Sequence, residues 1–250
     1  MVPLWKSHYS IGRSILTLEK PKDVIDGGPD SIISLAVANN LKEIVLVDDN
    51  MSGFLQGYVN AKEANLKYIF GLKVNICNDI ADKTDESWEK TSKIIIFIKN
   101  TNGYKNLLKI YSKAATDGFY YEPRLDYKIL NELWTENLLL AIPFYDSFVF
   151  NNSIRISTCI PDFSQITPTF FVEDQNLPFD ALIKEKVLEF AAANEYEVQN
   201  THSIYYNKRG DFKAYLTFRC INKRTTLEKP NIDHMSSDSF CLEEYFNKIK

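Results

Sequence analysis

The stretch EIVLVDDNMSGFLQGYVNAKEANLKYIFGLKV, residues 43–74, holds two apolar runs on either side of a segment with helical periodicity. Residues 43–50 are typical of a short buried strand that ends in two carboxylates. Apolar residues recur at helical spacing over residues 55–65, and residues 67–76 form a second apolar run rich in β-branched and aromatic side chains. The stretch therefore predicts a strand, a helix and a second strand, which together make one unit of an α/β fold.

The same alternation continues along the chain. Further helices are predicted at residues 30–41, 105–116, 126–134, 179–194 and 240–249, and further strands at residues 90–100, 136–144, 163–174 and 195–203. This alternation indicates a parallel sheet with helical crossovers, and six or more such units favour a barrel. Functional residues of such barrels follow the carboxyl ends of the strands. The positions to inspect are Lys6–His8, Asp48–Asp49, Lys73, Lys93–Asn100, Pro143–Phe144 and Asn200–Ile204.

Composition and charge narrow the class of protein. The chain has 250 residues, of which 45% are hydrophobic, and this suits one domain over residues 1–250. The net charge of −4 lacks the basic excess of proteins that hold nucleic-acid phosphates, so any contact with nucleic acid is expected to be weak or indirect. No membrane partner is expected, because no run approaches the roughly 20 apolar residues of a membrane span. Lys6, His8 and Arg13 interrupt any apolar signal sequence.

The cysteine and histidine content indicates the cellular compartment and limits the kind of metal site that the chain can form. The chain has four widely spaced cysteines without a C-x-x-C pair, which favours free buried thiols in a reduced cytoplasm. We expect a bacterial cytoplasm or, if a bacteriophage encodes the chain, the cytoplasm of its host, because the content of asparagine, lysine and isoleucine suits an AT-rich source. A multi-histidine metal centre is hard to build from the three histidines present: His8, His202 and His234.

Several motifs occur in order along the chain and carry a resemblance. They are SHYS (7–10), VDDNMSGFLQG (47–57), KNTNGYKNLLKIYSKAATDGFYYEPRLD (99–126), NTHSIYYNK (200–208), TTLEKPN (225–231) and SSDSFCLEE (236–244). In this order they resemble the PHP (polymerase and histidinol phosphatase) domain family, in the version found at the N-terminus of the bacterial DNA polymerase III alpha subunit. The resemblance implies a distorted (β/α)7 barrel. In active members it implies up to three metal ions at the strand ends, where metal-bound hydroxide hydrolyses phosphate esters.

The first half of the family's ligand pattern is altered in this sequence. By the resemblance, the first two histidines of the pattern fall on Leu4 and Lys6. His8 falls on a variable position and is expected to cap local structure or to pack near Tyr9. The aspartate of the next motif is kept as Asp48, and the histidine that follows it is replaced by Asp49.

The second half of the pattern is altered as well. The resemblance places Lys73 at a glutamate position, Lys93 at a histidine position and Phe144 at a cysteine position. His202 falls on the aspartate position of the last motif. Ile204 falls on its histidine position, so this ligand too is replaced by an apolar side chain.

These replacements predict a site without a metal cofactor and without catalytic residues. A protonated lysine has no lone pair to offer a metal and repels it, and three lysines stand at former ligand positions: Lys6, Lys73 and Lys93. Lysines can instead neutralise the buried carboxylates of Asp48 and Asp49 through charge-assisted hydrogen bonds. We therefore expect Lys73 or Lys93 to lie within salt-bridge reach of Asp48 or Asp49. The alternative is one zinc, manganese or iron ion held by Asp48, Asp49 and His202.

The resemblance then predicts a pseudoenzyme with the fold of a phosphoesterase. We expect a replication-associated scaffold that binds a polymerase or a 3′–5′ proofreading exonuclease, and that cannot polymerise DNA alone because palm and fingers regions are missing. One alternative is a metal-dependent phosphoesterase or 3′–5′ exonuclease with a reduced site. Another is a phage-encoded mimic that captures a host replication protein. The aromatic run Phe119–Tyr121 could stack on bases, but packing within the fold is the favoured interpretation.

Overall fold

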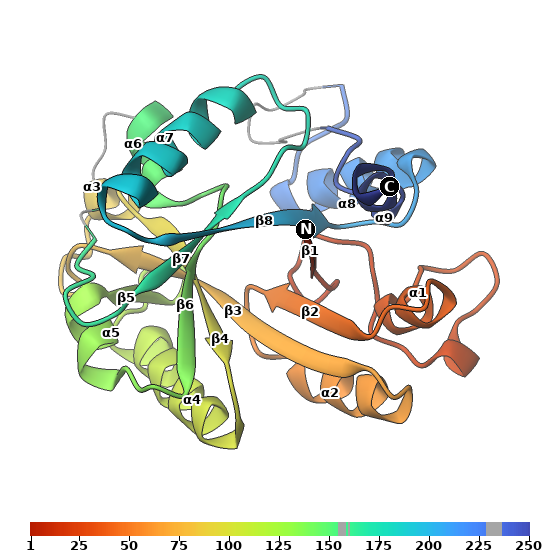
Figure 1. Ribbon diagram of the computed structural model, residues 1–250, viewed down its shortest axis with the longest axis horizontal. Coiled ribbons are helices and arrows are strands. Elements are labelled where there is room, and N and C mark those ends of the chain that lie inside the picture. The colour runs from red at the N-terminus through yellow and green to blue at the C-terminus, as the bar shows by residue number, and fades with distance from the viewer. Residues whose placement is uncertain (155–158, 160, 229–236) are drawn as a thin grey trace. The chain divides into compact units, whose positions relative to one another are not determined.

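The computed structural model describes all residues except 155–158, 160 and 229–236, so His234 lies outside the described residues. The chain divides into two compact units, which we describe separately (Figure 1). The first unit contains Met1–Phe70, Glu173–Asp180 and Asn200–Lys250, and the second contains Gly71–Val172 and Ala181–Gln199. The chain passes between the units within strands β3 (Lys67–Cys77) and β8 (Glu197–Ile204) and near the ends of β7 and α7.

In the first unit, β1 (Val2–Trp5) lies between β2 (Glu43–Asp48) and the last residues of β8, and both pairings are parallel. Strand β2 also pairs with β3. Helix α1 (Ile32–Ala38) packs beside β2 and α2 (Phe54–Glu63). Two further helices, α8 (Phe212–Lys223) and α9 (Leu242–Ile249), follow β8 (Figure 1).

The second unit contains the rest of β3 with β4 (Ser92–Ile98), β5 (Arg124–Asp126), β6 (Leu138–Ile142) and β7 (Pro168–Val172). Its helices are α3 (Asp85–Glu89), α4 (Thr101–Thr116), α5 (Tyr127–Leu133), α6 (Phe148–Ile154) and nearly all of α7 (Asp180–Ala193). Helix α4 packs beside α5 and β4 (Figure 1). Side chains start both helices, because Asn100 accepts the Gly103 N–H and Asp126 accepts the Ile129 N–H.

The strand pairings confirm the predicted seven-stranded barrel. The order is β2-β1-β8-β7-β6-β4-β3, and the pairing of β2 with β3 returns it to its start, while β5 adds to the far side of β3. One strand differs from the all-parallel prediction, since β4 runs antiparallel to both β3 and β6. Its run IIIFI is largely buried on both faces. A strand that is buried on both faces is apolar throughout, so its sequence does not indicate whether it runs parallel or antiparallel to its neighbours.

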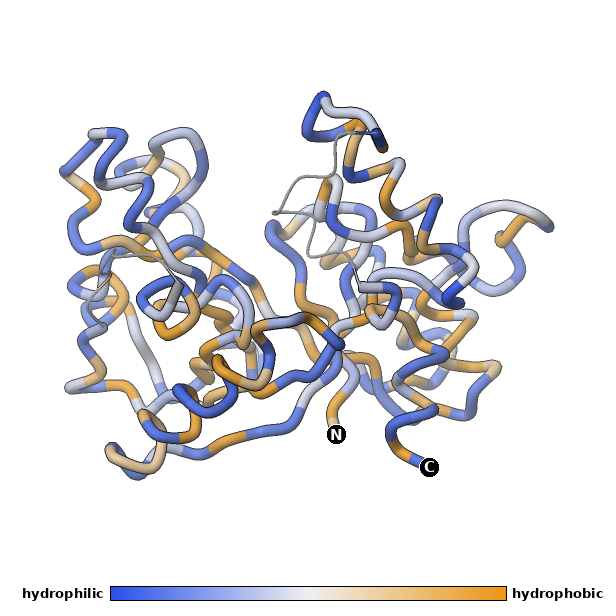
Figure 2. The backbone as a smooth tube through the Cα atoms, turned by 90° about the horizontal axis from the view of Figure 1, so that it is seen from above, coloured by the Kyte–Doolittle hydropathy of each residue, from blue (hydrophilic) through white to orange (hydrophobic). Residues whose placement is uncertain are grey.

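Hydropathy explains where the core lies within each unit. The inner residues of β2 and β4, among them Leu46 and Ile96, are fully buried, whereas many of the outlying loops are hydrophilic (Figure 2). Burying these β-branched and aromatic runs is the main driving force for the fold. In the described part of the chain, none of the helices has the length and apolar content that crossing a membrane requires.

Candidate functional site at the strand ends

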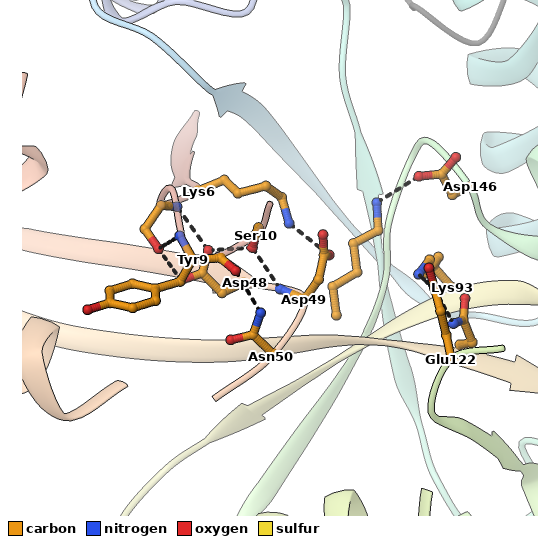
Figure 3. Close-up of polar contacts among 12 residues, drawn as sticks. Lys6, Tyr9, Ser10, Asp48, Asp49, Asn50, Lys93, Glu122 and Asp146 are labelled. Carbon is orange, nitrogen blue, oxygen red and sulfur yellow. Dashed lines mark hydrogen bonds and ion pairs between the residues drawn. The ribbon is translucent and has the colours of Figure 1, made fainter. Parts of the chain in front are cut away.

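Asp48, the last residue of β2, organises the loop that follows β1. Its side chain is fully buried, and the Ser7 N–H and hydroxyl donate to it at 2.9 and 2.6 Å. The Ser10 hydroxyl donates to it as well, at 2.8 Å (Figure 3). Burial raises the pKa of Asp48, while the charge of Lys6 and the hydrogen bonds from both serines act to lower it. The serines therefore satisfy both oxygens of the carboxylate, which was expected to pair with a lysine.

The neighbouring carboxylate does form a pair of the predicted kind. Lys6 Nζ lies 2.9 Å from Asp49 Oδ1, and the two side chains point toward each other (Figure 3). The Lys6 side chain is 7% exposed and that of Asp49 is 26% exposed. The backbone N–H of Asp49 also donates to the Ser10 hydroxyl at 2.9 Å. One lysine at a position that the resemblance assigns to a ligand is thus paired with a carboxylate at another such position.

In the second unit, the other two lysines have acidic partners that the sequence did not reveal. Lys73 Nζ lies 3.1 Å from Asp146 Oδ2, and Lys93 Nζ lies 3.7 Å from Glu122 Oε2 (Figure 3). Asn75 also donates to the same oxygen of Glu122, at 2.9 Å. Each of these two lysines therefore pairs within its own unit, with an acid that follows β6 or precedes β5, and the expected pairing with Asp48 or Asp49 is wrong.

The apolar residues at positions that the resemblance assigns to ligands belong to the core. Leu4 is 5% exposed, and both Phe144 and Ile204 are fully buried. The Phe144 ring packs edge-on against Tyr145, with ring centroids 4.9 Å apart. These side chains fill space and offer no atom to a metal.

His202 is directed toward the C-terminal helix. Its Nε2 lies 3.1 Å from the Cys241 carbonyl oxygen, and its ring lies 6.0 Å from that of Tyr245. Burial lowers the pKa of His202 to about 4, so the ring is neutral near pH 7 and Nε2–H donates to the carbonyl. In the register of β1 and β8, His202 is paired with Pro3 and Ser203 with Leu4.

The register of β1 and β8 also shows which residues of the two strands lie on the same face of the sheet. Paired residues share a face of the sheet and successive residues alternate, so Ser203, not His202, lies on the face of Leu4. The described residues include no group of three or more histidine, cysteine, aspartate or glutamate side chains placed to hold a metal ion. Asp48, Asp49 and His202, the alternative ligand set, do not form such a group among these residues.

Sequence reasoning missed one buried acid of the first unit. Glu173 follows β7 directly and is 5% exposed. It accepts the N–H and the hydroxyl of Ser203, both at 2.8 Å, and the side-chain amide of Gln175 at 2.9 Å. Its place near the carboxyl end of the strand predicted over residues 163–174 was the signal that could have identified it.

His8 lies in the loop that follows β1, and its side chain does not contact the Asp48 carboxylate. Its ring centroid lies 4.4 Å from that of Tyr9, and its Nδ1 lies 3.3 Å from the Leu16 carbonyl oxygen. The expectation that His8 packs near Tyr9 is confirmed.

Comparison with known proteins places this arrangement in a family. The family model for the PHP domain matches residues 26–160, more than half of the chain. DNA polymerase III subunit alpha of Aquifex aeolicus is 25% identical over 234 residues, which are 86% of this chain and 20% of the relative. The Thermus aquaticus subunit is 25% identical over 209 residues, which are 78% of this chain and 17% of the relative.

A third relative is more similar over a shorter stretch. DNA polymerase III subunit alpha of Borreliella burgdorferi is 36% identical over 121 residues, which are 46% of this chain and 10% of the relative. The chain thus spans about a fifth or less of the length of these three relatives. With the matched pattern, the strand pairings and the motif order in agreement, the chain belongs to the PHP domain family.

Proposed function

We propose that this chain is a DNA-replication protein that binds partner proteins and does not hydrolyse phosphate esters. The observation that carries the proposal is the Lys6–Asp49 ion pair at 2.9 Å, which joins two former ligand positions. The replication setting is supported by the similarity to DNA polymerase III subunit alpha over 86% of the chain.

The chemistry of the strand ends supports the loss of metal catalysis. A metal that took the place of the Lys6 ammonium would have to expel a buried cation from its carboxylate. Asp48 already accepts three hydrogen bonds, which occupy both of its oxygens. In the second unit, Lys73 and Lys93 engage the carboxylates of Asp146 and Glu122 in the same way. A divalent cation would therefore have to compete for carboxylates that ammonium groups, hydroxyls and a backbone N–H already hold.

Binding of a partner is the role that remains for such a domain. We infer that the partner is a DNA polymerase or a 3′–5′ proofreading exonuclease, because the relatives are replicative polymerase subunits several times longer than the matched region. In this role the lysine–carboxylate pairs keep the fold intact and take no part in chemistry.

Two assays test the two halves of the proposal. Purified chain with added Mn²⁺ or Zn²⁺ is expected to leave a phosphate monoester and single-stranded DNA intact. Turnover that disappears in Asp48→Asn would overturn the pseudoenzyme half. Immobilised chain is expected to retain a purified replicative polymerase or a 3′–5′ exonuclease of a related bacterium, and the Lys6→Met variant should retain it equally. Retention of neither protein would overturn the binding half.

A further inference from the structure

A partly exposed aromatic cluster lies on the second unit, formed by Trp88, Tyr120 and Tyr121. The ring centroids of Tyr120 and Tyr121 are 4.5 Å apart, and those of Trp88 and Tyr121 are 5.7 Å apart. Tyr121 is 63% exposed, so this run does not pack inside the fold as expected. Its backbone has a φ of 60°, in the left-handed region that bulky residues rarely adopt. Strain of this kind is retained where the surroundings impose it, often at binding sites.

A carboxylate and a buried arginine hold the rings in place. The hydroxyls of Tyr120 and Tyr121 both donate to Asp85 Oδ1, at 3.0 and 3.1 Å. The Arg124 guanidinium lies 5.1 Å from the centre of the Tyr120 ring and is fully buried. It donates to three neutral oxygens, those of Gly118 O, Ser87 Oγ and Asp82 O. The aromatic surface is therefore fixed before any ligand arrives, which lowers the entropy lost on binding.

Gly118 lies very close to the backbone of Arg124, the residue that supports the Tyr120 ring. A Cβ atom at Gly118 would lie 1.9 Å from the Arg124 carbonyl oxygen, so only glycine fits. The turn from α4 into the aromatic run thus depends on this residue, and the Arg124 backbone and side chain both meet it.

Charge decides which ligand fits the aromatic cluster. The segment 79–90, which includes α3, carries five acidic residues and two lysines, and one of the lysines pairs with Glu86. The five acids are all exposed: Asp79, Asp82, Asp85, Glu86 and Glu89. This field repels the phosphates of a nucleic acid and attracts cations. Asp85 Oδ2 takes no hydrogen bond from the described residues, so one carboxylate oxygen beside the rings is available.

We propose that the aromatic–acidic surface of Trp88, Tyr120, Tyr121 and Asp85 binds an arginine side chain of a basic protein segment. A guanidinium stacks on an aromatic face and at the same time donates to a carboxylate oxygen, and a lysine ammonium stacks less well. Asp85 Oδ2 is the acceptor, and the exposed ring of Tyr121 is the stacking partner.

Titration of the full chain with a capped hexa-arginine peptide tests this proposal. Hexa-arginine is expected to bind more tightly than hexa-lysine. Tyr121→Gly should weaken the binding of hexa-arginine about tenfold. Glycine adopts the left-handed backbone without strain, so this variant keeps the fold. Asp85→Asn should also weaken binding. Tyr58→Ala is the matched control, because Tyr58 is a 44% exposed tyrosine of α2 in the first unit, and it should bind as the wild type does.

The contrary outcomes are equally specific. Equal affinity of the wild type and Tyr121→Gly for hexa-arginine, with both folded by circular dichroism, would overturn the proposal. Binding of a single-stranded oligonucleotide that is lost in Tyr121→Gly would assign the surface to nucleic acid and would also overturn it. The titration needs no replication partner, so the proposed function stands or falls separately.

Discussion

The ammonium of Lys6 and the carboxylate of Asp49 lie 2.9 Å apart, with the lysine side chain almost fully buried. Lys6 follows β1 and Asp49 follows β2, two adjacent parallel strands whose carboxyl ends meet. The pair thus occupies the place where barrels of this kind carry their chemistry. Its charge is balanced internally, which is the arrangement of a structural element.

Removal of the ammonium tests how much the pair contributes. Lys6→Met keeps the aliphatic length and removes the ammonium that pairs with Asp49, so the free energy of unfolding should fall by about 2 kcal/mol, between the values of exposed and buried pairs. Urea denaturation measures the change. Lys67→Met is the matched control, because the Lys67–Glu43 pair is exposed, and it should change stability by less than about 0.5 kcal/mol. Equal effects of the two variants would contradict the structural role of Lys6.

Replacement of Asp48 is expected to lower the stability of the fold more than replacement of one of its hydrogen-bond donors. Asp48→Ala leaves the Ser7 N–H and two serine hydroxyls without an acceptor in a buried place, which should lower the free energy of unfolding by about 3 kcal/mol. Ser10→Ala removes one donor to Asp48 and one acceptor of the Asp49 N–H, and it should lower the free energy of unfolding by about 1–2 kcal/mol. Chemical denaturation of both variants gives the order. A smaller loss for Asp48→Ala than for Ser10→Ala would contradict this network.

His202 should make stability depend on pH. Its folded-state pKa of about 4 lies below the ordinary value of 6.5. The folded state therefore binds the proton less readily, and the contribution of His202 is complete above pH ~6.5 and is lost as the pH falls through 4. Its size is on the order of 3 kcal/mol.

Urea unfolding between pH 4 and pH 7 measures this dependence. In His202→Gln the loss of stability on acidification should be smaller than in the wild type by that amount. Identical pH profiles for the wild type and His202→Gln would contradict the burial of a neutral ring.

Glu173 is expected to fix β7 to β8. Glu173→Gln places an amide nitrogen where a carboxylate oxygen accepted a hydrogen bond, so a donor of Ser203 or Gln175 loses its acceptor. Thermal and urea unfolding should show a loss of about 1–2 kcal/mol. Glu189→Gln removes a charge from an exposed pair on α7 and should have almost no effect. An unchanged free energy of unfolding for Glu173→Gln would contradict the structural role of this acid.

Much of the fold was predictable because its strands and helices have clear periods. The strand and helix expected within residues 43–65 and the strand expected at 67–76 agree with β2, α2 and β3 to within two residues at each end. The direction of β4 was not predictable, since its side chains are buried on both faces. Strand β5 has only three residues, too few to show a period.

The site was predictable in composition but not in its partners. Lys73 and Asp146 are 73 residues apart in the sequence, and no local pattern joins them. The stretch NTHS allows two registers that differ by one residue, and such a shift moves every side chain to the other face. Only the pairing of β1 with β8 decides that His202 faces the C-terminal helix and Ser203 lies beside Leu4.

The metal content of the chain, purified without chelator and then dialysed against Zn²⁺ and Mn²⁺ in turn, tests the central claim most directly. Elemental analysis by inductively coupled plasma mass spectrometry should find neither metal in a near-stoichiometric amount, because Lys6 holds Asp49 and the serines satisfy Asp48. Near-stoichiometric metal that is lost in Asp48→Asn but kept in His8→Gln would contradict the account, since it would mean that the metal displaces Lys6 from its carboxylate.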